Sequence, residues 1–214
     1  MINQPHIDAF IKALLSMDQD AARRLMENLT NDRDAIKITS QLIVPALEFI
    51  GSGWERGNIA LSQVYMSGRI CEKLIDEILP PGSPQRTDLP VMGIGVLNDH
   101  HVLGKRVIYS ALRASGYDLI DLGFGLSSQD MIDITLKNEI KILLISVLML
   151  PSALHVKEIT TALKPHGIKI IVGGAPFRFD KKLFREVGAD ATGDNAGEAI
   201  QIVTRLVEEY YATV

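Results

Sequence analysis

From Leu89 to the end of the 214-residue chain, short apolar runs alternate with amphipathic segments. The runs predict β-strands at Val91–Leu97, Asp118–Leu122, Ile142–Ser146, Ile168–Val172 and Ala189–Thr192. The amphipathic segments predict helices at Lys105–Ser115, Ser128–Asn138, Ala153–Lys164, Lys181–Val187 and Ala196–Tyr211. Strands that are apolar throughout are typical of a parallel sheet covered on both faces. The alternation therefore predicts an α/β domain with a flavodoxin-like, doubly wound five-stranded parallel sheet.

The first 79 residues instead repeat apolar side chains at helical spacing, which predicts four amphipathic helices. Polar residues able to begin the second, third and fourth helices are Asp18, Asn31 or Asp32, and Ser62. Pro45 is expected to kink the third helix, and the Gly51-Ser52-Gly53 cluster to weaken its end. Four such helices joined by short links form a small N-terminal bundle.

A proline-rich stretch, Pro80 to Asp88, interrupts every periodicity and predicts an exposed linker. The expected organisation is a helical cap bundle at 1–79, a linker at 80–88 and an α/β domain at 89–214.

Composition excludes several classes of function. A net charge of −4 gives no footprint for nucleic acid or an acidic membrane. The N-terminus lacks the regions of a signal peptide, and the longest apolar run, Ile142–Met149, is too short to span a bilayer. The single cysteine, Cys71, excludes an internal disulfide. We therefore expect a cytoplasmic protein with neither a nucleic-acid nor a membrane partner.

The loop after the first predicted strand carries the most unusual polar residues. Asp99 precedes His101 by two positions, and His100 lies between them. A carboxylate at that spacing can accept a proton from one ring nitrogen and leave the other free to bind a metal. The alternative is that Asp99 caps the following helix while both histidines are merely solvated. Ligand loops are expected where strands end, at residues 98–104, 123–127, 146–152 and 173–177.

Glycine motifs for nucleotides are absent. Gly93-Ile94-Gly95 lies inside a strand without a third glycine, Gly123-Phe124-Gly125 is isolated, and no Walker-type loop is present. The pair Gly173-Gly174 ends the fourth strand, where it would let a bound group approach the backbone or simply form a turn.

Together these loops resemble the cobalamin-binding domain family. The resemblance rests on Asp99-x-His101-x-x-Gly104, on Ser146-x-Leu148 and on Gly173-Gly174, each at the end of a different strand. The segment Gly53-Trp54-x-x-Gly57-x-x-x-Leu61-x-Gln63 is similar to the family's helical cap, as found in methionine synthase. A cap and sheet domain with nothing else attached resembles the free-standing corrinoid proteins of methyltransferase systems.

The resemblance implies a site. His101 would be the lower axial ligand of cobalt, and Asp99 would hold its other ring nitrogen. Ser152, six residues after Ser146, would bond to Asp99 and complete a relay. The displaced nucleotide tail of the cofactor would lie beside Ser146, Leu148, Gly173 and Gly174, with Gly104 in the same cofactor site. His100 has the wrong register and is expected to be exposed in the loop.

The implied cap would cover the upper face of the corrin. Trp54 lies in the segment expected there, although it could equally be a core aromatic of the bundle. Three residues depart from the family pattern: Asn98 replaces a usual glycine, Leu150 a common threonine, and Ala60 a phenylalanine of several members. These departures concern the tuning of the site more than cofactor binding.

The implied function is that of a methyl carrier using cobalamin, as methylcobalamin and cob(I)alamin, or a related corrinoid. A substrate:corrinoid methyltransferase would load the methyl group and a corrinoid:acceptor methyltransferase would deliver it to a folate or thiol. A reductive activase would be a third partner. The cap would move aside for each transfer, and the protein would carry no catalytic side chain and would turn over little alone. The alternatives are a cobalamin-dependent sensor, a mutase subunit and a flavodoxin-like response module.

Overall fold

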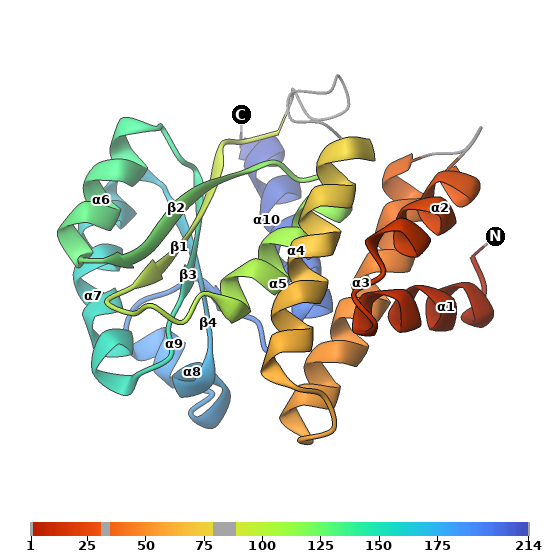
Figure 1. Cartoon of the computed structure of the whole chain (residues 1–214). Helices are drawn as coiled ribbons and strands as arrows, with labels where there is room; N and C mark the ends of the chain where they lie inside the picture. Colours follow the sequence, from red (N-terminus) through yellow and green to blue (C-terminus); the bar gives the residue numbers. More distant parts are fainter. Residues whose placement is uncertain (1, 31–34, 79–88, 214) are drawn as a thin grey trace. The chain divides into compact units, whose positions relative to one another are not determined.

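A computed structural model describes residues 2–30, 35–78 and 89–213 (Figure 1). The chain divides into two compact units. Of the described residues, the first unit contains 2–30, 35–78 and 106–117. The second unit contains 89–105 and 118–213. The predicted linker at 80–88 and the predicted helix start at Asn31 or Asp32 lie outside the described residues.

The first unit contains the four predicted helices: α1 (Gln4–Leu15), α2 (Gln19–Thr30), α3 (Ala35–Glu55) and α4 (Leu61–Ile78). Asn3 begins α1 through a capping box with His6, and the Asp18 carboxylate accepts the backbone N–H of Ala21 at the start of α2. Their apolar faces form a common core that includes Phe10, Leu14, Met26, Leu42, Leu47, Ile50, Leu74 and Ile75. Cys71 belongs to this core, and burial raises the pKa of its thiol, which makes it unreactive.

Helix α3 does not weaken at the glycine cluster, so that expectation is wrong. The helix continues through Pro45 and through Gly51-Ser52-Gly53 to Glu55. A Cβ at position 53 would lie 2.4 Å from Cδ1 of Ile59, a residue of the turn that leads to α4. Gly53 is therefore buried where α3 and the turn meet closely, and packing outweighs its low helix propensity.

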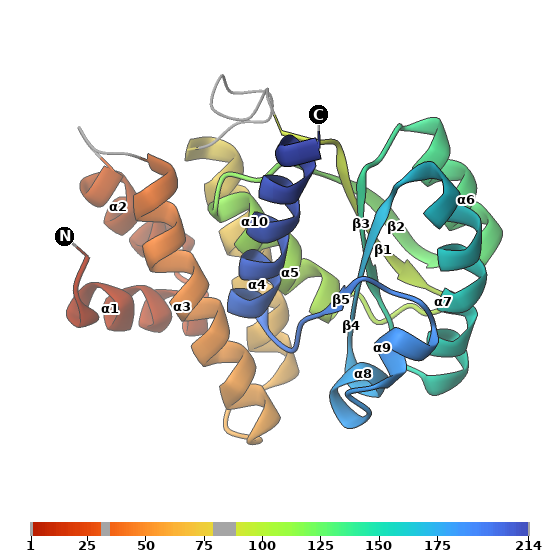
Figure 2. The same cartoon turned by 180° about the vertical axis from the view of Figure 1, so that it is seen from behind.

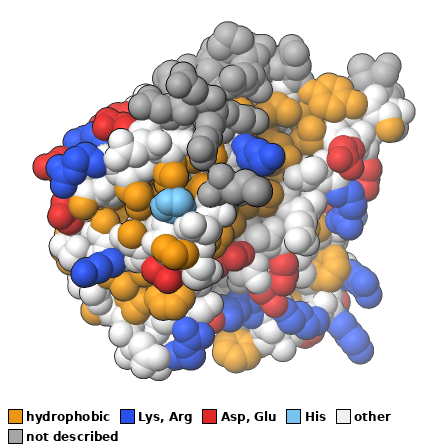
Figure 3. Space-filling view, turned by 90° about the vertical axis from the view of Figure 1, so that its right-hand side faces the viewer, with side chains coloured by type: hydrophobic (Ala, Val, Ile, Leu, Met, Phe, Trp, Pro, Cys, Tyr) orange, Lys and Arg blue, Asp and Glu red, His pale blue; other side chains and the backbone are white. Residues whose placement is uncertain are grey.

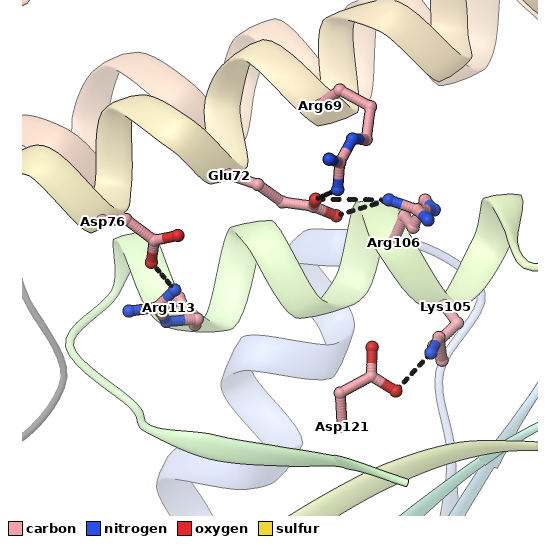
Figure 4. A network of polar contacts seen from close by, with 7 residues as sticks. All are labelled: Arg69, Glu72, Asp76, Lys105, Arg106, Arg113 and Asp121. Carbon is pink, nitrogen blue, oxygen red and sulfur yellow. Dashed lines mark hydrogen bonds and ion pairs between the residues drawn. The ribbon is translucent and has the colours of Figure 1, made fainter. Parts of the chain in front are cut away.

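Helix α5 (Leu103–Ala114) begins in the second unit and continues into the first. Within the first unit, its basic side chains pair with carboxylates of α4 (Figure 4). Nη1 of Arg106 lies 3.2 Å from Oε2 of Glu72, and Arg113 pairs with Asp76. The four residues occupy matching faces of the two helices, so the ion pairs fix α5 against α4.

The second unit has the predicted five-stranded parallel sheet, in the order β2-β1-β3-β4-β5. The strands are β1 (Met92–Leu97), β2 (Leu119–Leu126), β3 (Ile142–Ser146), β4 (Lys169–Gly173) and β5 (Ala191–Thr192). The helices are α6 (Ser128–Lys137), α7 (Leu150–Leu163), α8 (Ala175–Phe179), α9 (Leu183–Glu186) and α10 (Ala196–Thr213). Helices α6 and α7 cover one face and α10 the other (Figures 1 and 2), as a doubly wound sheet requires.

Two bounds and one additional helix differ from the predictions in ways that affect the site. Strand β2 runs to Leu126, so most of the expected loop at 123–127 is strand. Helix α7 begins at Leu150, three residues early, and the short helix α8 was not predicted. Over the part of the chain that the structure describes, no helix combines the length and apolarity needed to cross a membrane.

Candidate functional site

Asp99 and His101 form a close pair in the loop between β1 and α5. Oδ1 of Asp99 lies 2.6 Å from Nδ1 of His101 and also accepts the backbone N–H of His101 at 2.8 Å. Asp99 is 5 % exposed, whereas the His101 side chain is 71 % exposed. Since an ionised carboxylate only accepts, Nδ1 carries the proton and the lone pair of a neutral ring lies on Nε2. Nε2 has no partner among the described residues, so the pair presents an oriented imidazole that can bind a metal.

Asp99 is ionised at neutral pH. Burial disfavours its charge, but the backbone N–H and ring of His101, together with the backbone of His100, donate to the carboxylate and hold its pKa below the ordinary value. These bonds close a turn onto His101 rather than cap α5, which begins two residues later. The interpretation of Asp99 as a helix cap is therefore wrong.

An irregular stretch of β2 holds this loop. The backbone N–H of Asn98 donates to the carbonyl of Leu126 at 2.8 Å, and the N–H of Gly125 donates to the carbonyl of Asp99 at 2.7 Å. The pairing of β1 with β2 shifts register in this region, where Gly123 and Gly125 have φ of +97° and +67°. Glycine adopts such angles without strain, so these two isolated glycines shape the strand that supports the Asp99 loop.

A buried lysine adds a second support from the start of α5. Lys105 is 4 % exposed and pairs with Asp121 of β2, and the two side chains point toward one another in Figure 4. The ammonium also donates to the carbonyl of Gly123 at 3.3 Å, and the same Asp121 oxygen accepts the N–H of Gly123 at 2.8 Å. Lys105 and Asp121 therefore fix the irregular part of β2 to the helix that follows His101.

Removing the two partners should have unequal effects. Asp121→Ala leaves the buried ammonium without its carboxylate and should lower the free energy of unfolding by about 2–3 kcal/mol. Lys105→Met leaves a half-exposed carboxylate in water and should cost only about 1 kcal/mol. Lys169→Met is the matched control, because Lys169 is half-exposed, unlike the buried Lys105, and its pairing with Asp190 at 3.8 Å should contribute less than about 0.5 kcal/mol. Urea unfolding measures all three, and equal effects at Lys105 and Asp121 would contradict this description.

The other two predictions for this loop concern Asn98 and His100. Asn98 has φ of +51°, a left-handed conformation that asparagine tolerates better than most residues and that glycine adopts freely. His100 is exposed, as predicted, and its ring packs edge-on against Phe124 with 5.6 Å between the centroids. The two neighbouring imidazole rings thus lie in different surroundings, and of the two rings only that of His101 is hydrogen-bonded to the carboxylate of Asp99.

The predicted small residues also meet at the carboxyl edge of the sheet. Val96, Ser146 and Gly173 pair across β1, β3 and β4 in one row. Gly104 belongs to the same place, since a Cβ there would lie 3.7 Å from Oγ of Ser146. Four of the predicted cofactor residues, Gly104, Ser146, Gly173 and Gly174, therefore come together beside the Asp99 loop.

Gly174 needs no ligand to explain it. Its φ of +118° is an angle that side chains rarely allow, and a Cβ would lie 1.8 Å from the carbonyl oxygen of Val147. The backbone of Val147 fills the space beside Gly174, so the local chain path alone requires glycine there, and a role of Gly174 in cofactor binding stays a prediction.

The relay implied through Ser152 is not formed. Ser152 is buried in the first turn of α7, but no hydrogen bond joins it to Asp99 in the described structure. Oδ2 of Asp99 is instead buried without a partner among the described residues. A buried carboxylate oxygen in this position is an acceptor left open, so the relay stays a prediction for the cofactor-bound protein.

Large apolar side chains lie exposed around the same edge. Leu148, Met149 and Leu150 follow β3, and Phe124 lies in β2 beside His100. The sequence predicts Leu148 as a site residue, whereas Leu150 is only a departure from a common threonine. Met149 and Phe124 could not be recognised from spacing, because the exposure of an apolar residue depends on the fold.

The first unit contains the predicted cap residue Trp54. It is 44 % exposed in the last turn of α3, so it is not a core aromatic of the bundle. Gln63 secures the adjacent turn, since its amide accepts the N–H of Ala60 and donates to the carbonyl of Leu15 at 3.2 Å. A position of Trp54 over a cofactor stays a prediction.

A groove that no sequence pattern indicated lies between α1 and α3. It has a volume of about 500 Å³ and is lined by Asp8, Ile11, Lys12, Leu15, Ser16 and Phe49. Apolar side chains gather among charged ones on the face viewed in Figure 3, from the side of the N-terminal helices.

A parallel sheet with an oriented histidine and small residues at the carboxyl edge of its strands is typical of a cofactor-binding α/β protein. One family model of the B12 binding domain matches residues 90–201, and a second, also of a B12 binding domain, matches residues 6–79. The chain belongs to the B12-binding family. Its cofactor is cobalamin or a related corrinoid.

Known proteins agree with this assignment. Monomethylamine corrinoid protein 1 of Methanosarcina mazei is 29 % identical, with 97 % of this chain and 100 % of that protein covered. The structure of the Methanosarcina barkeri monomethylamine corrinoid protein is similar with a TM-score of 0.65 at 26 % identity, covering 96 % and 100 % of the two chains. A cobalamin-binding protein of Desulfitobacterium hafniense shares the fold with a TM-score of 0.66 at 22 % identity, covering 97 % and 100 %.

The residues present fit a corrinoid. His101 offers a free ring nitrogen for cobalt, and Asp99 orients it from the buried side. A Cβ at Gly104 would meet only Oγ of Ser146, at 3.7 Å, so the space beside these two residues is open, which suits a thin cofactor tail. The exposed Leu148, Met149 and Leu150 offer apolar contact to a large macrocycle.

Proposed function

We propose that this chain is the corrinoid protein of a methyltransferase system, carrying a methyl group between two partner enzymes. The bound corrinoid supplies the cobalt that takes up and releases the methyl group. The observation that supports this most directly is the Asp99–His101 pair, with Nδ1 held at 2.6 Å and the ring exposed. The relatives named as monomethylamine corrinoid proteins, similar over nearly the whole chain, support the same function.

The protein's own residues would bind and orient the cofactor. His101 would donate Nε2 to cobalt, while Asp99 keeps the ring in one tautomer and orientation and raises its basicity. Any proton taken up by His101 would weaken that bond, because a protonated imidazole has no lone pair. Ser146, Gly173 and Gly104 would line the tail, and Leu148 would exclude water beside it.

We further propose that monomethylamine is the first methyl donor to test. The sequence does not distinguish methylamines, methanol, thiols and aryl methyl ethers, since the donor is chosen by the partner enzyme. The names of the relatives favour a methylamine. A substrate:corrinoid methyltransferase, an acceptor methyltransferase and a reductive activase would be the partners.

The experiment loads the full chain with hydroxocobalamin, reduces it, and follows the visible spectrum of the bound corrinoid. We expect no change with monomethylamine alone, and a rapid change when a monomethylamine:corrinoid methyltransferase is added. Parallel reactions use a methanol methyltransferase with methanol and a dimethylamine methyltransferase with dimethylamine. A change with one of these alone would reassign the donor, and no change with any methyltransferase would contradict methyl carriage.

A further inference from the structure

The side chain of Asn98 links the loop that bears His101 to helix α7. Its amide nitrogen lies 2.9 Å from Nδ1 of His155, which is 57 positions away in the sequence and projects from the second turn of α7. The amide group can only donate through nitrogen, so Nδ1 of His155 accepts and its proton lies on Nε2 in the neutral ring. This hydrogen bond joins two side chains. It is additional to the backbone hydrogen bonds that join Asn98 and Asp99 to β2.

The backbone conformation at position 98 suits glycine as well as asparagine, so the link to α7 depends on which of the two residues is present. With φ of +51°, glycine would meet no strain there, and asparagine is among the few other residues that tolerate this region. Glycine, however, has no side chain to reach α7. Asn98 therefore satisfies the backbone requirement and adds a contact that glycine cannot make.

Asn98 also lies immediately before the residue that orients His101. Its N–H is bonded to β2, its side chain to α7, and the next residue, Asp99, holds both the backbone and the ring of His101. The β2 bonds fix the loop from one side only. A contact to α7 restrains it from the other side, which limits how far Asp99 and His101 can shift together.

We propose that Asn98 and His155 are positioning residues that brace the His101 loop between β2 and α7. The brace would set the orientation of the axial imidazole through Asp99, which follows Asn98 in the chain and holds the ring of His101. The existence of the brace does not depend on the proposed function. Its effect on cobalt ligation rests on the proposed role of His101 as the axial ligand.

Amide hydrogen exchange in the cofactor-free full chain tests the brace first. Asn98→Gly and His155→Ala should each speed exchange of the Asn98 and His101 amides by about three- to tenfold, the effect of one hydrogen bond on local opening. The double variant should exchange no faster than the faster single variant, because both remove the same bond. The double variant is needed because Asn98→Gly by itself also increases the conformational freedom of the backbone.

Two further variants separate positioning from general stability. In His155→Asn the side-chain oxygen lies close to the place of Nδ1, so it should restore exchange to near the wild-type rate. His166→Ala, which removes another exposed histidine of the same unit, should change nothing at the loop. Wild-type exchange in both single variants, or fully additive effects in the double variant, would overturn the proposal.

Loading with hydroxocobalamin then measures the consequence for the ligand. The visible spectrum should show a smaller fraction of histidine-bound cobalt at pH 7 in Asn98→Gly and His155→Ala, and a normal fraction in His155→Asn. If even the wild-type chain lacks histidine-bound cobalt, the proposed function fails, while the exchange data still decide whether the brace exists. Faster exchange with unchanged cobalt ligation would overturn the positioning role.

Discussion

Gly174→Ala should destabilise the second unit by about 3 kcal/mol or more, because the added methyl has no place to go. Its Cβ would lie 1.8 Å from the oxygen, 2.9 Å from the carbon and 3.3 Å from the nitrogen of Val147. These are backbone atoms, so a side-chain rotation cannot relieve the clash. The backbone must also keep a φ of +118°, which alone costs about 1–3 kcal/mol for a residue other than glycine.

The clash would reach the cofactor site as well. Val147 lies between Ser146 and Leu148, and its N–H donates to the carbonyl of Gly173 at 3.0 Å. A displaced Val147 would shift both neighbours and break that bond. Hydroxocobalamin binding by Gly174→Ala should therefore be weaker by about tenfold or more, which corresponds to about 1.4 kcal/mol.

Gly104→Ala is the matched control. A Cβ at position 104 would meet only Oγ of Ser146, at 3.7 Å, in ordinary contact. The first turn of a helix tolerates alanine better than glycine, so urea unfolding should show unchanged or slightly higher stability. Any loss of cobalamin binding in this variant would then reflect the space beside Ser146. Normal stability and normal binding in Gly174→Ala would contradict the conformation described for this loop.

The sequence predicts the sheet well because its signal is simple. The run Ile142–Ser146 predicts β3 with both ends correct, since a strand buried on both faces needs apolar residues throughout. Gly123 and Gly125 predict the end of β2 too early, because glycine marks both turns and irregular strands. Gly53 misleads in the same way, since only the contact with Ile59 shows why α3 tolerates it.

In the site, a contact within one loop could be predicted from the sequence, whereas contacts between distant elements could not. The spacing of Asp99 and His101 predicts their hydrogen bond, because two residues in one tight turn can meet without help from the rest of the fold. The contact between Asn98 and His155 could not be predicted, since it joins residues 57 positions apart. The same holds for Lys105 and Asp121, whose pairing requires the register of α5 against β2.

His101→Ala should remove the bond between the protein and cobalt. The structure places no second imidazole on the Asp99 carboxylate, among the described residues, that could replace it. The visible spectrum of bound cobalamin should shift toward the form without an axial histidine. Cofactor should still bind, because the predicted tail residues at Ser146 and Gly173 lie on separate strands from the ligand loop.

Asp99→Asn should weaken the same bond without removing it, by about tenfold or more as for other changes behind a metal-bound histidine. An asparagine keeps an acceptor for the ring but has less charge to raise its basicity. Its amide nitrogen would also replace Oδ2, which is buried without a partner among the described residues. His100→Ala is the control, since His100 packs on Phe124 and should leave the spectrum unchanged.

Electron paramagnetic resonance of the cobalt(II) form, with ¹⁵N-labelled histidine, tests the central claim most directly. The spectrum reports hyperfine splitting from the axial nitrogen, and the label distinguishes a histidine from the cofactor's own base. We predict a histidine signal in the wild-type chain and in His100→Ala, and its loss in His101→Ala. A signal that survives in His101→Ala and disappears in His100→Ala would contradict the assignment of His101 as the ligand of cobalt.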